Sequence, residues 1–91
     1  MEREKSIELL NGTYEFPCVF TVKVIGAQTD DFVDRVLAAV RDESDDFPYS
    51  TRSTPNGKHV AITMEPTLKS AEQVLAIYER VSMVRGVVMT M

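Results

Sequence analysis

The stretch that decides the fold is 49-YSTRSTPNGKHVAITM-64, in which Asn56-Gly57 separates two extended runs. Asn-Gly is the preferred dipeptide of a two-residue type I′ turn, so we expect a β-hairpin whose turn is flanked by Pro55 and Lys58. The expected cross-strand pairs are Ser53 with Val60, Thr51 with Ile62 and Tyr49 with Met64. In this register the apolar residues of the later strand share one face, which favours a sheet with one buried side.

Residues 16–25 (FPCVFTVKVI) predict an earlier strand, because β-branched and aromatic residues dominate the run and its apolar positions alternate. The expected inner face carries Phe16, Cys18, Phe20, Val22 and Val24. Gly26 is expected to end this strand. A helix should then begin at the N-cap candidates of residues 29–31 (Thr-Asp-Asp) and end near Arg41, since apolar residues recur between them at helical spacing.

The second half of the chain predicts one more helix and one more strand. Ser70-Ala71-Glu72-Gln73 fits a capping box, with a serine N-cap and a glutamine at the third helical position. The expected apolar stripe of this helix is Ala71, Val74, Leu75, Tyr78 and Val81. Residues 86–91 (GVVMTM) predict a short final strand. Residues 1–15 are expected to form an N-terminal extension that is frayed or partly disordered, and residues 16–91 a single domain.

The predicted order of elements, β-α-β-β-α-β, is typical of the split-βαβ or ferredoxin-like sandwich of the α+β class. This fold is a four-stranded antiparallel sheet with two helices on one face. Right-handed crossovers place the first and third strands at the centre and the second and fourth at the edges. The expected core residues are Phe20, Val22, Val36, Leu37, Ile62, Leu75 and Tyr78.

Composition and charge exclude several classes of protein. The chain has 91 residues, 44% of them hydrophobic, and a net charge of −4, so it lacks the basic surplus that drives nucleic-acid binding. No run approaches the roughly 20 apolar residues of a membrane span, and the opening MEREKSIELLNG lacks the apolar core of a signal peptide, so a cytoplasmic protein is expected. One Cys and one His supply neither a disulfide nor a zinc ligand set, so no metal and no cofactor are expected.

The sheet face opposite the helices supplies one group of candidate contact residues. These are Thr21, Lys23, Arg52, His59 and Thr63, which offer donors to a carboxylate or to an acidic side chain of a partner. His59 is also the one candidate general base, although a solvated histidine beside the hairpin turn is the favoured interpretation. An enzyme that uses this face around His59, and a weak nucleic-acid-binding module, stay open as alternatives. Cys18, on the inner face, is expected to be a small core residue.

The motif Phe16-Pro17-x-x-Phe20-x-x-Lys23-Val24-x-Gly26 resembles the YbeD-like family of small uncharacterised bacterial proteins. The similarity continues through the hairpin and through Glu72-Gln73-Val74-x-x-x-Tyr78-Glu79, and it covers residues 9–91. The family has no established activity. The resemblance implies a ferredoxin-like domain similar to the ACT-type regulatory domains of amino-acid metabolism.

In ACT-like domains effectors bind at the connection that follows the first strand, which by position implicates Gly26, Ala27, Gln28 and Thr29 here. The neighbouring aspartates favour a zwitterion, or no ligand at all, over a simple anion. A tight strand-to-helix turn without a ligand stays open as well. The leading hypothesis is a non-catalytic regulatory or adaptor domain that acts through a protein partner or a homodimer and, in second place, through a small metabolite such as an amino acid or carboxylate.

Overall fold

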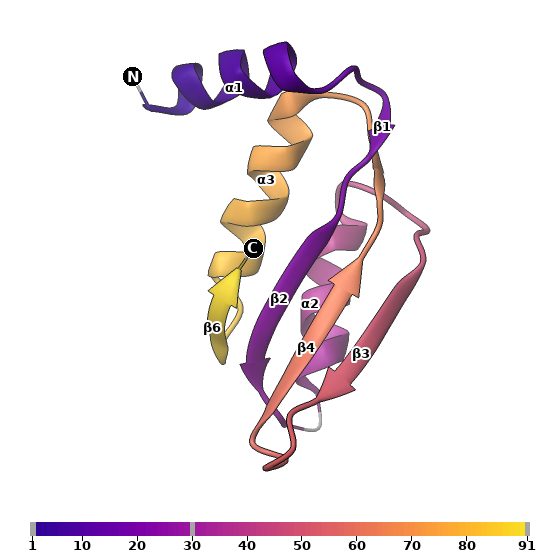
Figure 1. Cartoon of the computed structure of the whole chain (residues 1–91), viewed down its shortest axis with the longest axis vertical. Coiled ribbons are helices and arrows are strands. Elements are labelled where there is room, and N and C mark those ends of the chain that lie inside the picture. Colours follow the sequence, from indigo (N-terminus) through magenta and orange to yellow (C-terminus); the bar gives the residue numbers. More distant parts are fainter. Residues whose placement is uncertain (1, 30, 91) are drawn as a thin grey trace.

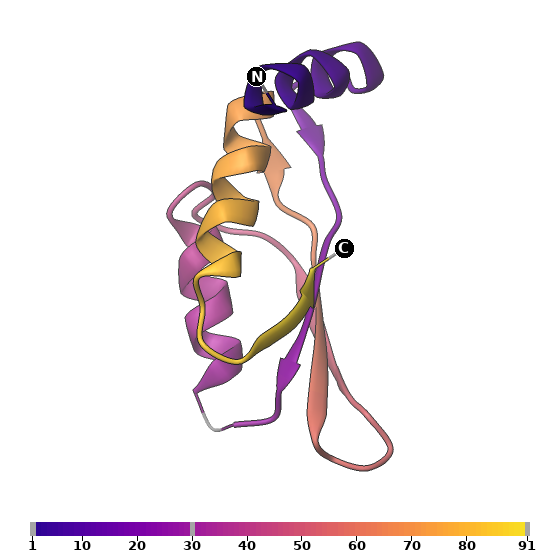
Figure 2. The same ribbon diagram turned by 90° about the vertical axis from the view of Figure 1, so that its left-hand side faces the viewer.

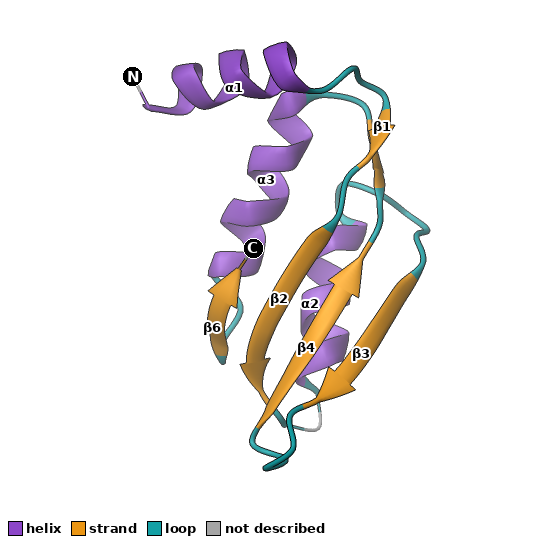
Figure 3. Cartoon of the chain, in the orientation of Figure 1, coloured by secondary structure: helices purple, strands orange, loops and turns teal. Residues whose placement is uncertain are grey.

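The computed structural model describes residues 2–29 and 31–90, which form one four-stranded sheet, a two-stranded ladder and three helices (Figures 1 and 3). The elements are α1 (Glu2–Thr13), β1 (Cys18–Val19), β2 (Val22–Ala27), α2 (Phe32–Arg41), β3 (Tyr49–Ser53), β4 (His59–Met64), β5 (Thr67–Leu68), α3 (Ala71–Ser82) and β6 (Val87–Thr90). The larger sheet is antiparallel in the order β3-β4-β2-β6, which confirms the predicted ferredoxin-like topology with β2 and β4 at its centre.

Helices α2 and α3 cover the same face of this sheet and leave the other face open (Figure 2). Side chains alternate along the two central strands, so that every second residue is buried. The buried layer contains Val22, Val24, Val60, Ile62 and Met64 from the sheet, and Phe32, Val36, Leu37, Val40, Val74, Ile77 and Val81 from the helices. This layer contributes most of the apolar burial that stabilises the domain.

The β3–β4 hairpin has the predicted register but a different turn. Ser53 pairs with Val60, Thr51 with Ile62 and Tyr49 with Met64. The predicted type I′ turn is wrong, because it needs a positive φ at Asn56 and no described residue other than glycine has one. Instead the Gly57 amide donates to the Thr54 carbonyl (2.9 Å), and the Thr54 amide donates to the His59 carbonyl (2.9 Å). Pro55, with its fixed negative φ, favours this longer loop, and Gly57 (φ 70°) closes it.

The predicted first strand is divided in two. Cys18 and Val19 form β1 and pair with β5, whereas β2 begins only at Val22. Gly26 does not end the strand: it lies within β2 and is buried. A Cβ atom at this position would lie 2.1 Å from the Phe32 Cζ and 2.7 Å from the Gly86 carbonyl oxygen. The glycine is therefore required by close packing against the Phe32 ring.

Helix α3 begins at the predicted cap but turns a slightly different face to the sheet. The Ser70 Oγ accepts a hydrogen bond from the Gln73 amide (3.3 Å), as a capping box predicts. Ile77 is fully buried, although the predicted stripe omitted it, whereas Leu75 and Tyr78 are only partly buried. These two side chains lie on the side of α3 that faces α1, since they line a hollow together with α1 residues. Phe20 is likewise only partly buried and packs against the edge of the core.

Residues 2–13 form a helix, where a frayed or partly disordered extension was expected. Helix α1 lies across the N-terminal end of α3 (Figures 1 and 2), and an ion pair between Arg3 and Glu79 joins the two helices. Leu10 packs against the core, whereas Leu9 is 70% exposed. The apolar residues of α1 form no regular stripe, which is why the sequence pattern did not predict the helix.

Candidate functional site

The open face of the sheet brings together three of the five sequence-predicted contact residues. Lys23 on β2 is paired with Thr63 on β4, which is paired in turn with Ser50 on β3. One pair further along, Arg52 on β3 lies opposite Ala61 on β4. A hollow of about 250 Å³ is lined by Lys23, Ser50, Thr51, Arg52, Ala61 and Thr63. Lys23 and Arg52 therefore come from strands on either side of β4, and three residues with hydroxyl groups share the lining.

These two cations have no acidic partner among residues 2–29 and 31–90. The ion pairs of the described residues join Arg3 to Glu79, Arg35 to Asp31, and Arg80 to both Asp42 and Glu43. A cation without a counter-ion next to hydroxyl donors is a favourable environment for an incoming carboxylate. This polar hollow, which we call the sheet-face site, can hold an anionic group at the surface.

Thr21 and His59, the other two predicted members, do not line this hollow. Thr21 is exposed just before β2 begins, and His59 begins β4 opposite Ala27. The His59 main chain is held by Thr54, whose hydroxyl accepts from the His59 amide (3.2 Å). The imidazole has no hydrogen-bond partner within the described part of the chain, so nothing orients it as a general base.

The predicted effector loop, Gly26 to Thr29, is tied to the protein by its own main chain. The Ala27 amide donates to the Gly86 carbonyl (3.0 Å), the Gln28 amide to the Lys58 carbonyl (3.0 Å), and the Thr29 amide to the Ala27 carbonyl (2.9 Å). The Gln28 side chain accepts from the Ser53 hydroxyl (2.9 Å). The amides of Ala27, Gln28 and Thr29 therefore already have acceptors within the protein.

Two arginines that the sequence analysis did not select lie beside this loop. A hollow of about 430 Å³ is lined by Ala27, Thr29, Asp31, Arg35, Arg85 and Gly86. Arg35 lies one helical turn after Asp31, a spacing that the sequence shows. Arg85 comes from the far end of the chain. The one signal in the sequence that could have indicated its position is the predicted strand order, because this order places the start of the last strand beside the end of the first. Asp30, one of the three cap candidates, lies outside the described residues.

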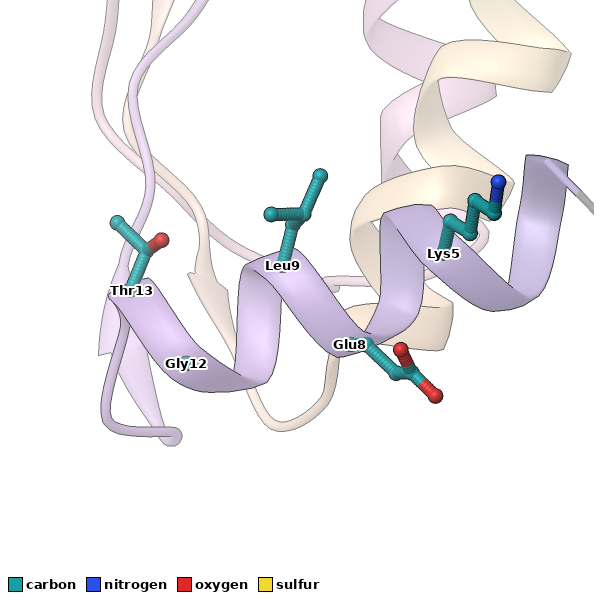
Figure 4. A pocket seen from close by; sticks show the side chains of 5 residues that line it. All are labelled: Lys5, Glu8, Leu9, Gly12 and Thr13. Atoms are coloured by element: carbon teal, nitrogen blue, oxygen red, sulfur yellow. The ribbon is translucent and has the colours of Figure 1, made fainter.

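The junction of α1 and α3 forms a third hollow, of about 290 Å³, which is mainly apolar. It is lined by Ser6, Leu9, Leu10, Phe20, Val74, Leu75 and Tyr78. Partial burial raises the pKa of Tyr78, and the neighbouring Tyr14 raises it further. On the outer surface of α1 a further hollow is lined by Lys5, Glu8, Leu9, Gly12 and Thr13 (Figure 4). There Lys5 and Leu9 point to one side of the helix and Glu8 to the other, so its polar groups do not converge.

The described residues contain no group of three or more histidine, cysteine or acidic side chains that could hold a metal ion. Cys18 is a free thiol, and it is half-buried in β1 where a core position was expected. Its strand pairs with β5 beyond the main sheet, and Cys18 is not among the buried core residues. Among the helices that the structure describes, none combines the length and the apolar character that a membrane crossing needs.

This chain has the fold of an ACT-like ferredoxin domain, as its strand order and its two helices on one face of the sheet show. Solved structures of this fold align with it. The ACT domain from the GTP pyrophosphokinase of Chlorobium tepidum aligns with a TM-score of 0.62 at 10% identity, over 81% of this chain and 97% of that one. The solution structure of protein HP0495 from Helicobacter pylori aligns with a TM-score of 0.63 at 19% identity, over 87% of this chain and 86% of that one. At these identities the likeness concerns the fold.

The chain belongs to the family described as protein of unknown function (DUF493), whose model matches residues 12–91. A UPF0250 protein of Shewanella sediminis is 34% identical over 74 residues, which are 80% of this chain and 84% of that protein. A UPF0250 protein of Shewanella amazonensis is 29% identical over 84 residues, or 87% of this chain and 96% of the relative. These matches confirm the resemblance that the first-strand and hairpin motifs indicated. Helix α1 lies almost wholly outside the matched region.

Proposed function

We propose that this protein is a non-catalytic regulatory or adaptor domain that acts through protein contacts made by the open face of its sheet. The observation that carries the proposal is the sheet-face site, where Lys23 and Arg52 surround Ser50 and Thr63 without an acidic partner in the described chain. The ACT-like fold supports a regulatory role, because its sheet offers one face to a partner while the other is filled by helices. The proposed location is the cytoplasm.

The chemistry of the site favours an acidic side chain of the partner. Arginine can bind a carboxylate through two parallel hydrogen bonds, and lysine adds a second positive charge from the other side of β4. The whole chain carries a net charge of −4, so these two cations provide local positive charge on an acidic protein. A partner that presents an aspartate or glutamate would therefore bind in one orientation.

A second copy of the chain is an alternative partner, because the edge strand β6 exposes apolar residues. Val88 is 64% exposed and Met89 is 50% exposed on this strand. Exposed strand edges are common pairing surfaces in oligomers. A small metabolite, either an amino acid or a carboxylate, is proposed as the effector of this domain at the hollow beside residues 26–29.

Charge reversal tests the sheet-face site. A photo-crosslinking residue placed at Ser50 in cells should capture a partner, and the Lys23→Glu/Arg52→Glu variant should lose at least about tenfold of that product, since two charge-assisted contacts become repulsive. The matched control is Arg41→Glu/Lys69→Glu, which reverses two charges on exposed residues outside the site and should leave the product unchanged. Equal capture by both variants would refute the proposal. Sedimentation analysis of the purified proteins identifies a second copy as the partner if Lys23→Glu/Arg52→Glu loses self-association and Arg41→Glu/Lys69→Glu keeps it.

A further inference from the structure

Strand β3 is one edge of the main sheet, and its outer side is open. Its hydrogen-bonded neighbour is β4, and Figure 1 shows no element beyond it on the other side. Every residue of β3 is exposed. Proteins usually protect such an edge with a proline or a bulge, because a free edge pairs with other chains. Here the register with β4 is unbroken from Tyr49 to Ser53, and the nearby Pro48 and Pro55 lie outside the strand.

The hydrogen bonds that flank β3 show which of its main-chain groups are free. Just after the strand, the Thr54 amide donates to the His59 carbonyl (2.9 Å). Just before it, the Pro48 carbonyl accepts from the Glu65 amide (3.0 Å). In an antiparallel ladder every second residue bonds to the neighbouring strand, and the residues between point their N–H and C=O groups away from it. The residues of β3 that point away from β4 are Tyr49, Thr51 and Ser53. They have no main-chain hydrogen bond to a described residue outside the hairpin.

The two faces of β3 present different side chains beside this free edge. On the open face Arg52 lines the sheet-face site, so that site reaches the edge itself. On the other face Tyr49 lies opposite the buried Met64, yet it is 50% exposed. An added strand would therefore have a cation beside one of its faces and an aromatic residue beside the other.

We propose that β3 accepts an extended, acidic segment of the partner protein as an added strand of the sheet. This inference rests on the proposed function, and it names the conformation and the chemistry of the partner at the sheet-face site. Opposite charges directly across two strands stabilise their pairing, so an acidic residue of the segment lies opposite Arg52. Successive side chains of a strand point to opposite faces, and the next residue therefore lies on the face of Tyr49. The segment that fits alternates acidic and apolar residues.

A second copy of the chain fits this edge less well than an acidic segment. Pairing of two β3 strands would extend the open face into one surface with two copies each of Arg52 and Lys23, and like charges on one face oppose pairing. Glu65 follows β4 in the same alternation, but it bonds to Pro48, which lies about 13 Å along the strand from Arg52. The other edge strand, β6, contains no charged residue and so cannot select an acidic segment.

NMR spectroscopy of the ¹⁵N-labelled full chain with synthetic peptides tests the proposal. The probe is a blocked peptide in which valine and glutamate alternate, and the charge control has lysine in place of each glutamate. At saturation the acidic peptide should slow hydrogen exchange of the Tyr49, Thr51 and Ser53 amides at least about tenfold. The Ser50 and Arg52 amides should change less, because they already donate to β4. The lysine peptide should bind at least about tenfold more weakly, since it places a cation opposite Arg52.

Two N-methylated versions of the acidic peptide separate strand addition from charge attraction. A slip by one residue would turn the glutamates away from Arg52, so each peptide amide points either toward β3 or away from it. Methylation of one set, either all valine amides or all glutamate amides, should weaken binding at least about tenfold, and methylation of the other set should not. The valine set is the sensitive one if the added strand is antiparallel, and the glutamate set if it is parallel.

A pair of variants makes the same test on the protein. Thr51→Pro removes an N–H group that points away from β4 and should weaken peptide binding at least about tenfold. Thr51→Val is the matched control, because it keeps both the N–H group and the branched side chain. The spectrum of Thr51→Pro must keep the dispersion of the folded chain; the methylated peptides test the wild-type protein and do not depend on this variant.

Three results would overturn the inference. One is the absence of saturable shifts with the acidic peptide up to about 1 mM. The second is equal binding of the two methylated peptides. The third is protection of the Tyr49, Thr51 and Ser53 amides in a dimer of the free chain, which would assign this edge to a second copy. If charge reversal at Lys23 and Arg52 abolishes partner capture but the methylated peptides bind equally, the sheet-face site stands and strand addition is wrong.

Discussion

Replacing Gly26 by alanine should strongly destabilise the protein, because the space for a side chain is already filled. The new Cβ would lie 2.1 Å from the Phe32 Cζ, 2.7 Å from the Phe32 Cε1 and 2.7 Å from the Gly86 carbonyl oxygen. The ring cannot easily move away, since Phe32 is fully buried, and the carbonyl is held by the Ala27 amide. Overpacking of a filled core costs about 1 to 3 kcal/mol, and contact with a fixed ring and a backbone atom places this variant at or above the upper end.

The assay is equilibrium unfolding in urea, followed by circular dichroism. A domain of this length has a total free energy of unfolding of about 5 to 14 kcal/mol, so a loss of about 3 kcal/mol is a large fraction of it. With a slope of about 1 to 1.5 kcal/mol per molar urea, the midpoint should fall by about 2 to 3 M. Gly12→Ala is the matched control, because nothing lies within 4 Å of its added Cβ and the residue is helical. We expect that control to be neutral or to stabilise the protein by up to about 1 kcal/mol.

A second substitution tests the physical cause of the loss. Phe32→Leu removes part of the ring that the Gly26→Ala methyl group would contact. The cost of the double variant should therefore be smaller than the sum of the two single costs, by about 1 kcal/mol or more. A Gly26→Ala variant with nearly unchanged stability, or two costs that simply add, would refute the packing argument.

Three further predictions follow from the faces of α3 and from the position of α1. Ile77→Ala should lower the free energy of unfolding by about 2 to 5 kcal/mol, and clearly more than Leu75→Ala, because the isoleucine is fully buried and the leucine is not; urea unfolding of both variants checks the order. Because the pKa of Tyr78 is raised in the folded protein, the unfolded chain loses the hydroxyl proton of Tyr78 at a lower pH, and the free energy of unfolding should decrease as the pH rises above about 10. In an absorbance titration, the Tyr78→Phe variant should lack the tyrosine component that has the highest pKa. Removal of residues 1–13 should leave the ferredoxin-like domain folded but expose the apolar hollow at Leu75 and Tyr78. The truncated protein should therefore bind more of a hydrophobic dye than the full chain. Equal dye binding by the two proteins would show that α1 does not shield this hollow.

The hairpin shows why the fold was predictable and its turns were not. The register from Tyr49 to Met64 depends on alternation, and a slip by one residue would move every apolar side chain of β4 to the open face. The turn depends on local competition, in which the fixed φ of Pro55 outweighed the preference of Asn56-Gly57 for a type I′ turn. Global burial therefore determined the pairing, whereas a single neighbouring residue determined the loop.

Helices α1 and α3 show a second limit of periodicity. The stripe of α3 allowed either Ile77 or Tyr78 to face the sheet, and the presence of α1 decided between them, because α1 provides apolar contacts for Leu75 and Tyr78. Helix α1 has no apolar stripe of its own, so its formation depends on tertiary contacts such as the Arg3–Glu79 ion pair and the packing of Leu10. The packing of α1 against α3 therefore explains both why α1 was not predicted and why the buried face of α3 was predicted incorrectly.

The two candidate sites differ in how far the sequence could define them, and the difference follows from how their strands are connected. Lys23, Arg52 and Thr63 come from strands whose facing is set by alternation, so the sheet-face residues could be selected in advance. Arg85 lies next to β6, which pairs with β2 although the rest of the domain separates them in sequence, and no short turn fixes their register. That register shifts by one residue between Ile25 and Gly26, where the Phe32 ring packs against Gly26 and Gly86. The position of Arg85 beside Arg35 is therefore a consequence of how one aromatic side chain packs, and periodicity contains no information about that contact.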